Sequence, residues 1–363
     1  MSILPCQMLR RMVLGLNPMI LADDRINEKQ IQPSSIDCRL GNIAYRMRTA
    51  AIPKRGEKIS DLIKEHSLYA FELNNKSILE RGGCYIIPLK EKLCLPDEFC
   101  ALFSPKSSIG RVDIFVRALA DDVPRYDRTR YGYTGPLYLE IVPLSFSVNI
   151  APDLEMVQMR IRNRDNSIYI DTEHILAMHS DRGLAYDDEG IIERALIENG
   201  ALYLGVDLKR KIIGFEAREN LSKELDLNKK YFYGADDFWI PIKGPREELI
   251  LTPDHFYLLS TKERVRTPPE CAVEVAAYSE NTGEFRSHYA GFFDPGFGGD
   301  NGTSAVLEIR PRDVHFRITD GQQICKMVFE KMTEIPDTLY GKTGSHYVGE
   351  GPSLSKHFLK NQW

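Results

Sequence analysis

The chain has 363 residues, 43% of them hydrophobic, which is enough to fill the cores of about two domains. Its 47 Lys and Arg residues against 52 Asp and Glu give a net charge of −5, so no global positive field exists to hold a nucleic-acid polymer. No run approaches the roughly 18 uninterrupted apolar residues of a membrane span, and the seven cysteines lie mostly in apolar runs, which favours free thiols in a reducing compartment. These features predict a soluble, cytoplasmic protein.

The first half of the chain is expected to be rich in strands. Short runs of β-branched and aromatic residues alternate with turns that contain Gly, Pro and Asp, which favours a barrel or jelly roll over a parallel sheet. A helical pattern occurs within residues 1–16, and residues 61–66 form a short candidate helix. The expected strands are residues 42–48, 84–88, 99–103, 114–118, 137–143, 147–150 and 156–161.

Residues 166–200 are expected to connect the two halves, with a helix over 189–199 that ends at Gly200. The strand pattern then resumes. The expected strands of the second half are residues 201–209, 257–260, 272–277, 305–309, 314–318 and 324–330. The tail, 340–358, is rich in Gly and Ser and has no periodicity, so we expect it to be disordered or to form a lid that orders on a ligand.

The two halves repeat each other. Residues 84–107 match residues 256–279 at a constant offset (279 − 107 = 172), and Glu140 with its neighbours matches Glu308 with its neighbours (308 − 140 = 168). This period is longer than the ~20–50 residues of solenoid repeats, so it indicates two copies of one domain. We therefore predict an all-β chain with two tandem barrel domains, 1–165 and 201–363, the second carrying the C-terminal lid tail, and a few short helices.

The densest polar cluster of the first copy is residues 104–111. Its hydroxyls, the backbone N–H groups near Gly110 and the two cations Lys106 and Arg111 are the groups that a polyphosphate needs. An ordinary polar turn with solvated Lys and Arg fits the same residues. The pattern therefore indicates a candidate anion site and leaves the plain turn as its alternative.

Glu140 is the second candidate. It lies between Leu139 and Ile141 in a strand of apolar residues, where burial would raise its pKa toward the range useful for proton transfer. An outward-facing glutamate is the commoner fate of such a residue.

Several other chemistries are excluded by the sequence. Cys94 and Cys100 are too far apart for the Cys-x-x-Cys pair of a zinc deaminase, and no His-x-Glu precedes them. Neither a Gly-x-x-x-x-Gly-Lys-Ser/Thr loop nor a Gly-x-Gly-x-x-Gly turn is present, which excludes kinase-like and dinucleotide-binding sites. No zinc or other metal ligand set is expected.

Three segments of the first copy occur in a characteristic order. They are Gln32-Pro33-Ser34-Ser35-Ile36-Asp37-Cys38-Arg39-Leu40-Gly41, Lys106-Ser107-Ser108-Ile109-Gly110-Arg111, and Gly132-Tyr133-Thr134-Gly135-Pro136-Leu137-Tyr138-Leu139-Glu140. Together they resemble the dCTP deaminases of the dUTPase-like superfamily, and the doubled domain resembles their long bacterial form. The resemblance implies a distorted, jelly-roll-like β-barrel for each copy.

The resemblance also implies the chemistry: hydrolysis of dCTP to dUTP and ammonia without a metal, feeding dUMP and dTTP synthesis, with Mg²⁺ only as the companion of the triphosphate. Glu140 matches the catalytic glutamate of the family, and Ser107 and Arg111 match residues that hold the attacking water. The implied substrate-binding residues are Lys106, Ser108, Ala120, Tyr347 and Lys356.

The last two belong to residues 346–356, which resemble the C-terminal arm that folds over bound nucleotide in this family. His346 stands where a lysine is usual and Glu350 stands near a glutamine position, so the contacts of this arm stay open.

The second copy keeps some of these features and loses others. Asp294 begins the Asp-Pro-Gly turn of the superfamily, which the first copy has lost, and Glu308 occupies the glutamate position. Glu280, however, brings an acid to the segment that should bind phosphate. We therefore predict that the first copy is catalytic, with Asp294 and Glu308 as candidate contributors from the second.

Three alternatives remain: a dUTP diphosphatase-like enzyme, a bifunctional nucleotide hydrolase, and a nucleotide-binding double barrel without turnover. The tail lacks the Gly-rich Arg-Gly-x-x-Gly-Phe-Gly-Ser motif that the first of these needs. Because family members assemble as trimers with sites between neighbours, the resemblance implies a homotrimer. The arrangement of the two copies and regulation by dTTP stay open.

Overall fold

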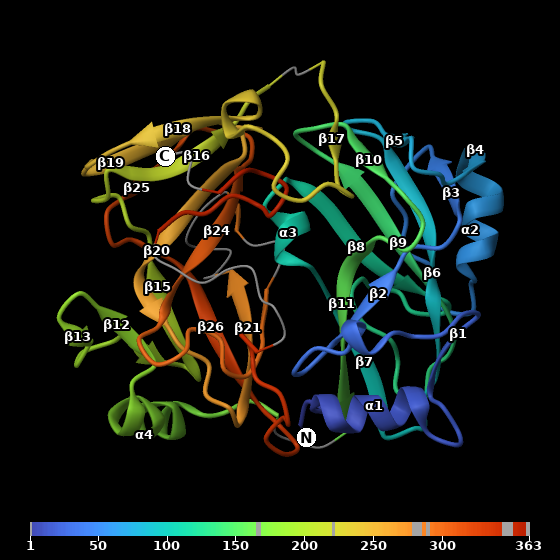
Figure 1. Cartoon of the computed structure of the whole chain (residues 1–363), viewed down its shortest axis with the longest axis horizontal. Helices are drawn as coiled ribbons and strands as arrows, with labels where there is room; N and C mark the ends of the chain where they lie inside the picture. The colour runs from blue at the N-terminus through green and yellow to red at the C-terminus, as the bar shows by residue number, and fades with distance from the viewer. Residues whose placement is uncertain are drawn as a thin grey trace. The chain divides into compact units, whose positions relative to one another are not determined.

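The computed structural model describes residues 2–164, 168–219, 222–277, 285–287, 291–342 and 351–360. The chain divides into two compact units, each with its own set of strands (Figure 1). Unit 1 comprises residues Met1–Asn166 and Ser222–Lys230, and unit 2 comprises Ser167–Leu221 and Tyr231–Trp363. The chain therefore passes from one unit to the other three times.

Strands dominate both units, and the helices are short. The helices are α1 (Cys6–Leu14), α2 (Ile59–His66), α3 (Ser107–Gly110) and α4 (Thr172–Arg182), with 3-10 turns η1 (Glu28–Gln30) and η2 (Ala235–Asp237). The strands of unit 1 are β1 (Ile20–Ala22), β2 (Ile36–Arg39), β3 (Ile43–Met47), β4 (Ser67–Glu72), β5 (Ser77–Leu79), β6 (Cys84–Cys94), β7 (Phe99–Pro105), β8 (Ile114–Ala120), β9 (Thr134–Pro143), β10 (Val148–Ile150), β11 (Glu155–Asn163) and β17 (Leu225–Asp226).

Unit 2 contains the remaining strands. They are β12 (Ala185–Asp187), β13 (Gly190–Ile191), β14 (Ile197–Glu198), β15 (Ala201–Gly205), β16 (Ile212–Ala217), β18 (Trp239–Lys243), β19 (Glu248–Leu251), β20 (Tyr257–Val265), β21 (Cys271–Ala277), β22 (Phe285–Ser287), β23 (Phe292–Phe293), β24 (Thr303–Pro311), β25 (Phe316–Thr319) and β26 (Gln323–Lys331). None of the helices in the described ranges is long and apolar enough to span a membrane.

In unit 1 the strands form three sheets. The largest has the order β4-β3-β6-β9-β8, with β1 on β6, and the two smaller sheets have the orders β2-β11-β7 and β17-β10-β5. All of these pairs are antiparallel except β10 with β17, which is parallel. Helix α2 contacts β3 and β4 at one edge of the largest sheet (Figure 1). The prediction of antiparallel β-barrel domains is thereby confirmed at the level of the sheets.

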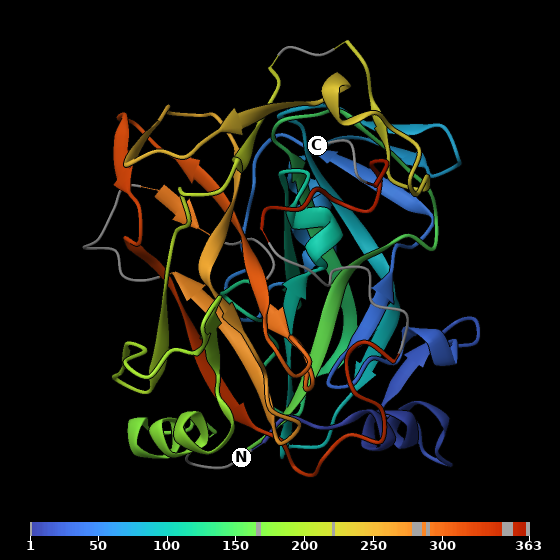
Figure 2. The same cartoon turned by 60° about the vertical axis from the view of Figure 1, so that its left-hand side comes forward.

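In unit 2 the equivalent large sheet has the order β13-β12-β20-β16-β18, with β24 on β20 and β22 on β24. The others are β14-β15-β26-β21-β23 and β19-β25. Helix α4 lies at one end of these strands and contacts β14 and β15 (Figures 1 and 2). A continuous core joins the two larger sheets, from Leu204 on β15 and Met327 on β26 to Leu259 on β20 and Leu307 on β24.

The repeat seen in the sequence is reproduced in single hydrogen bonds. The Tyr85 hydroxyl accepts a hydrogen bond from Glu80 N–H (3.0 Å), and the Tyr257 hydroxyl accepts the same bond from Thr252 N–H (3.1 Å). The ammonium of Lys90 pairs with Asp153 at 2.5 Å, and that of Lys262 pairs with Asp320 at 2.7 Å. The two copies therefore share side-chain contacts as well as a strand pattern.

One element was predicted wrongly. The expected helix at 189–199 is absent, because this stretch forms β13, a turn and β14, which pair with β12 and β15. The helix of this region is α4, where Asp171 caps the first turn by accepting a hydrogen bond from His174 N–H. The apolar residues before Gly200 do not form one buried face, because Ile197 lies in the core whereas Ile191 and Leu196 are exposed. The expected connector belongs to unit 2.

The end of the tail is anchored in unit 2. Lys356 accepts a backbone hydrogen bond from Tyr231 (2.8 Å), and Leu359 donates one to Tyr233 (2.9 Å). The Phe358 ring is buried against Phe238 and Trp239, with centroid distances of 5.6 and 6.0 Å. Residues 343–350, which include the predicted contacts of His346, Tyr347 and Glu350, lie outside the described residues.

Candidate active site

Glu140 lies on an inner strand of the largest sheet of unit 1. On β9 it pairs with Ile86 of β6 on one side and with Arg117 of β8 on the other. Leu139 and Ile141 face the barrel core, so Glu140 points to the opposite face of the sheet, yet it is completely buried (0% exposed). The expectation that this carboxyl is withdrawn from water is confirmed.

Two hydrogen bonds hold the carboxylate. The Tyr126 hydroxyl donates to Oε1 at 2.8 Å, and the Ala51 backbone N–H donates to Oε2 at 3.2 Å. Burial raises the pKa of Glu140, while these two hydrogen bonds and the charge of Arg117 partly offset the rise. The site therefore favours a carboxyl that exchanges a proton more readily near neutral pH than a solvated glutamate does.

An apolar cluster beneath α2 surrounds the carboxyl, and we call it the α2 cluster. It consists of Met47, Ile59, Leu62, Ile63, Ile86 and Leu119, with Tyr45, Ala51, Cys84, Tyr126 and Tyr138 packed against it. Burial and the Glu140 charge raise the pKa of the neighbouring Cys84 thiol to about 12. The same two causes raise the pKa of the Tyr126 hydroxyl.

Arg117 supports Tyr126 from the next strand. Its guanidinium lies 5.1 Å from the centre of the Tyr126 ring and forms an ion pair with Asp127 at 2.6 Å. Asp127 has a φ of 60° and also accepts a hydrogen bond from Ala118 N–H, so it fixes the residue that follows Tyr126. The orientation of the phenol over Glu140 is thus set by the loop between β8 and β9.

The predicted anion segment, 106–111, begins where β7 ends at Pro105. The Lys106 ammonium pairs with Asp37 at 2.5 Å and with Glu155 at 2.8 Å. Although burial would lower the pKa of Lys106, these two carboxylates outweigh it and raise the pKa. The Ser107 hydroxyl makes no hydrogen bond within the described part of the chain, whereas Arg111 is almost fully buried.

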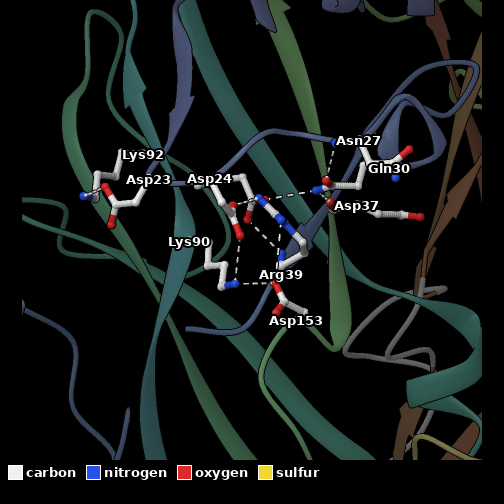
Figure 3. A network of polar contacts seen from close by, with 10 residues as sticks. Asp23, Asp24, Asn27, Gln30, Asp37, Arg39, Lys90, Lys92 and Asp153 are labelled. Atoms are coloured by element: carbon white, nitrogen blue, oxygen red, sulfur yellow. Dashed lines mark hydrogen bonds and ion pairs between the residues drawn. The ribbon is translucent and has the colours of Figure 1, made fainter. Parts of the chain in front are cut away.

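Asp37, which pairs with Lys106, also borders a polar network (Figure 3). Its centre is Glu91, which is fully buried and accepts hydrogen bonds from Gln30 Nε2 (3.0 Å), Arg39 N (2.7 Å) and Arg39 Nε (2.9 Å). Gln30 also donates to the backbone carbonyl of Asp37. Ion pairs of Arg39 and Lys90 with Asp24 and Asp153 complete the network at the surface (Figure 3).

The structure brings some predicted site residues together and leaves others apart. Ala120 ends β8 opposite Leu137 and is buried, three residues beyond Arg117. The hydrogen bonds of the Glu140 carboxylate within the described ranges go to Tyr126 and Ala51, and neither Ser107 nor Arg111 of the same unit takes part. Sequence reasoning missed Tyr126 and Ala51, which lie in irregular segments without a motif.

In unit 2, Glu308 on β24 pairs with Leu258 of β20 in the register that Glu140 has with Ile86. Glu308 is 3% exposed and Asp294 is 7% exposed, so both candidates are buried. Asp294 begins a turn in which Phe297 N–H bonds to its carbonyl and Gly296 has a φ of 88°, a conformation that favours glycine. Within the described residues, no group of three or more His, Cys, Asp or Glu side chains is placed to bind a metal.

Two family models cover nearly the whole chain. The 2'-deoxycytidine 5'-triphosphate deaminase N-terminal domain matches residues 1–165, and the C-terminal domain of the same family matches residues 161–358. The chain belongs to the 2'-deoxycytidine 5'-triphosphate (dCTP) deaminase family. Enzymes of this family are hydrolytic deaminases, and the resemblance seen in the sequence is thereby confirmed.

A solved dCTP deaminase has the same fold over almost the full length. The crystal structure of the enzyme from Agrobacterium tumefaciens superposes with a TM-score of 0.85 at 35% identity, covering 93% of this chain and 99% of that chain. This match confirms the prediction of a dUTPase-like all-β fold.

Shorter dCTP deaminases match part of the chain. A dUMP-forming dCTP deaminase of Coprothermobacter proteolyticus is 29% identical over 140 residues, 38% of this chain and 72% of the relative. A dCTP deaminase of Haloarcula marismortui is 30% identical over 135 residues, 36% of this chain and 65% of the relative. A dUMP-forming one of Methanosphaera stadtmanae is 35% identical over 112 residues, 30% of this chain and 55% of the relative. The matches therefore span between about half and three quarters of these relatives.

Proposed function

We propose that this chain hydrolyses the exocyclic C–N bond of dCTP, with Glu140 as the general base. The observation that carries the proposal is the buried Glu140 carboxyl, whose pKa is raised by burial, on an inner strand of a sheet in a dCTP deaminase fold. Glu140 takes a proton from water as the water oxygen bonds to C4 of cytosine. This proton passes to the amino group, which leaves as ammonia when the C4–N bond breaks, and the remaining proton of the water ends on ring atom N3 as C4 becomes a carbonyl.

Ser107 and Arg111 complete the proposed site by donating hydrogen bonds to the water and to the developing charge at C4. Because neither contacts Glu140 of its own unit, we propose that they come from a neighbouring copy of the chain in a homotrimer. This arrangement explains why the Ser107 hydroxyl is left without a hydrogen bond in the described part of the chain. Mg²⁺ enters the proposal as the companion of the triphosphate, whose charge it reduces.

The first product of this reaction is dUTP. Two of the relatives described above carry the words dUMP-forming in their names, which favours a second candidate function, a bifunctional hydrolase that also releases pyrophosphate. In that case a second water attacks the α-phosphate after the ring has lost its amine. Measuring dUTP, dUMP and pyrophosphate beside ammonia separates the two.

The test incubates the protein with dCTP and Mg²⁺ and compares wild type with Glu140→Gln and Glu308→Gln. Glu140→Gln should lower kcat by about 10²–10⁴-fold, the usual range for a lost general base, whereas Glu308→Gln should retain most of the activity. Binding of dCTP without ammonia release would favour the non-catalytic double barrel. Equal loss from both variants would contradict the choice of the first copy.

A second experiment tests the shared site. Co-assembling the inactive variants Glu140→Gln and Arg111→Ala in equal amounts should restore activity, because a site with Glu140 from one chain and Arg111 from its neighbour is intact in about a quarter of random pairings. If both residues act within one chain, the mixture stays inactive. A monomer in solution would contradict the trimer as well.

A further inference from the structure

The segments that cover Glu140 form a closed gate. The Tyr126 hydroxyl donates a hydrogen bond to Oε1 of Glu140, the Ala51 N–H donates one to Oε2, and Glu140 has no exposed surface. A general base must offer a lone pair to its water at about 2.6–3.2 Å; the Tyr126 hydroxyl takes one of these sites on Oε1 at 2.8 Å, and the lack of exposed surface keeps water from the others. The conformation seen here therefore holds the carboxylate away from any attacking water.

The two segments that cover Glu140, residues 51–59 and the loop that carries Tyr126, are hydrogen-bonded to each other. Asp121 Oδ1 accepts a hydrogen bond from Ile59 N–H (2.8 Å), and Asp122 Oδ1 accepts one from Gly56 N–H (2.5 Å). Asp122 N–H in turn donates to the Glu57 carbonyl (2.9 Å). The segment 51–59 and the loop that carries Tyr126 are thus linked, so release of one loosens the other.

The Tyr126 side chain is placed so that it can rotate away from Glu140. It is half-exposed, with its hydroxyl directed at Glu140 and one face of its ring against Arg117. The residue after it, Asp127, is held by backbone and side-chain bonds to β8, and Asp121 and Asp122 before it are bonded to segment 51–59, so the loop is held on both sides of Tyr126. Rotation of one side chain would uncover Oε1 without breaking a strand.

We infer that Tyr126 is a positioning residue that gates Glu140: it seals the carboxylate in the closed conformation, and substrate binding must displace its hydroxyl. The inference rests on the proposed function of Glu140 as the base. It adds that binding of dCTP and exposure of the base are coupled, so the free enzyme keeps its base away from bulk water until the nucleotide arrives.

Tyr126→Phe tests the gate because it keeps the ring and its packing but removes the donor. The closed form loses a hydrogen bond to a charged group, so the open fraction rises and the apparent KM for dCTP should fall by about tenfold with kcat retained. The matched control is Tyr138→Phe, which removes a hydroxyl from the same α2 cluster without a bond to Glu140. An unchanged KM, or a lower kcat in Tyr126→Phe alone, overturns the gate.

A second readout does not depend on turnover. The Ala51 amide bonds to Glu140 in the structure, and the link between the two segments predicts that opening releases it, so its hydrogen exchange should be about tenfold faster in Tyr126→Phe and unchanged in Tyr138→Phe. Equal exchange rates in both variants overturn the gate. Absence of ammonia release from wild type would defeat the proposed function, while the exchange rates would still decide the gate.

If Tyr126→Phe fails to fold, Asp122→Ala provides the same test. It removes the acceptor for Gly56 N–H on a half-exposed loop and leaves Tyr126 and Glu140 in place. Faster exchange of the Ala51 amide and a lower KM support the gate formed by segment 51–59 and the Tyr126 loop. Slow exchange as in wild type overturns it.

Discussion

Lys106 is predicted to hold the 106–111 segment in place, and Lys106→Met removes its charge while keeping most of its length. The ammonium lies between Asp37, whose side chain is 4% exposed, and Glu155, whose side chain is 34% exposed. Removing one partner of a buried ion pair costs about 3–5 kcal/mol, because the other charge stays buried. Asp37 keeps a hydrogen bond from Gln32 (3.3 Å) and Glu155 reaches water, so we expect the lower end, about 3 kcal/mol.

The assay is the free energy of unfolding from urea titration of the full chain, with Lys106→Arg as the charge-retaining control. Asp37→Asn introduced with Lys106→Met should recover about 2 kcal/mol, because it removes the stranded charge. The pKa of Lys106 is raised above 10.5, so its contribution is fully present below that value and is lost as pH rises through the higher folded pKa. The cost of Lys106→Met should therefore be constant between pH 7 and pH 9 and shrink only in strong base. A loss below about 1 kcal/mol, or additive effects in the double variant, would refute the reasoning.

Three further predictions concern the tail, the base and the thiols. Phe358→Ala should lower the free energy of unfolding by about 3–5 kcal/mol because it empties a buried aromatic site. The neighbouring Leu359 is 44% exposed, so Leu359→Ala should cost well under 1 kcal/mol. Comparable losses in the two variants would contradict the anchoring of the tail by Phe358. Because burial raises the folded pKa of Glu140, wild type loses stability as pH rises from about 4.3 through that pKa. Glu140→Gln lacks this loss, so its Tm should rise relative to that of wild type over the same pH interval. A Tm difference that does not depend on pH would argue against a raised pKa of Glu140. At pH 8 a maleimide should label the exposed Cys94 well before Cys84, whose thiol pKa of about 12 leaves about 10⁻⁴ as thiolate, and equal rates by mass spectrometry would rule this out.

Much of the strand programme was predictable from the sequence, because strand residues alternate between core and surface. Residues 137–143 and 257–260 were expected as strands and lie within β9 and β20. The helix expected at 189–199 failed because short β-ladders give the same apolar spacing as one helix face over so few residues. The choice between helix and strand depended on pairing with β12 and β15, which the local sequence pattern does not reveal.

The site was predictable in part. The burial of Glu140 followed from its apolar neighbours in the strand and was confirmed. Its partners Tyr126 and Ala51 were not predictable, since they come from irregular segments 14 and 89 residues away and no motif relates them to Glu140. The pairing of Lys106 with Asp37 and Glu155 was equally hidden, because it depends on β2, β7 and β11 lying side by side. The role of Lys106 toward the triphosphate stays a prediction.

The segment 222–230 has a consequence for any attempt to divide this chain. It belongs to unit 1 although the residues on both sides belong to unit 2, and Leu225 and Asp226 extend the sheet by pairing with Val148 and Asn149. A fragment ending at residue 165 would lack this strand and would leave the outer edge of β10 with unsatisfied N–H and C=O groups, a template for self-association. No single cut in the chain therefore separates unit 1 from unit 2 with both left whole.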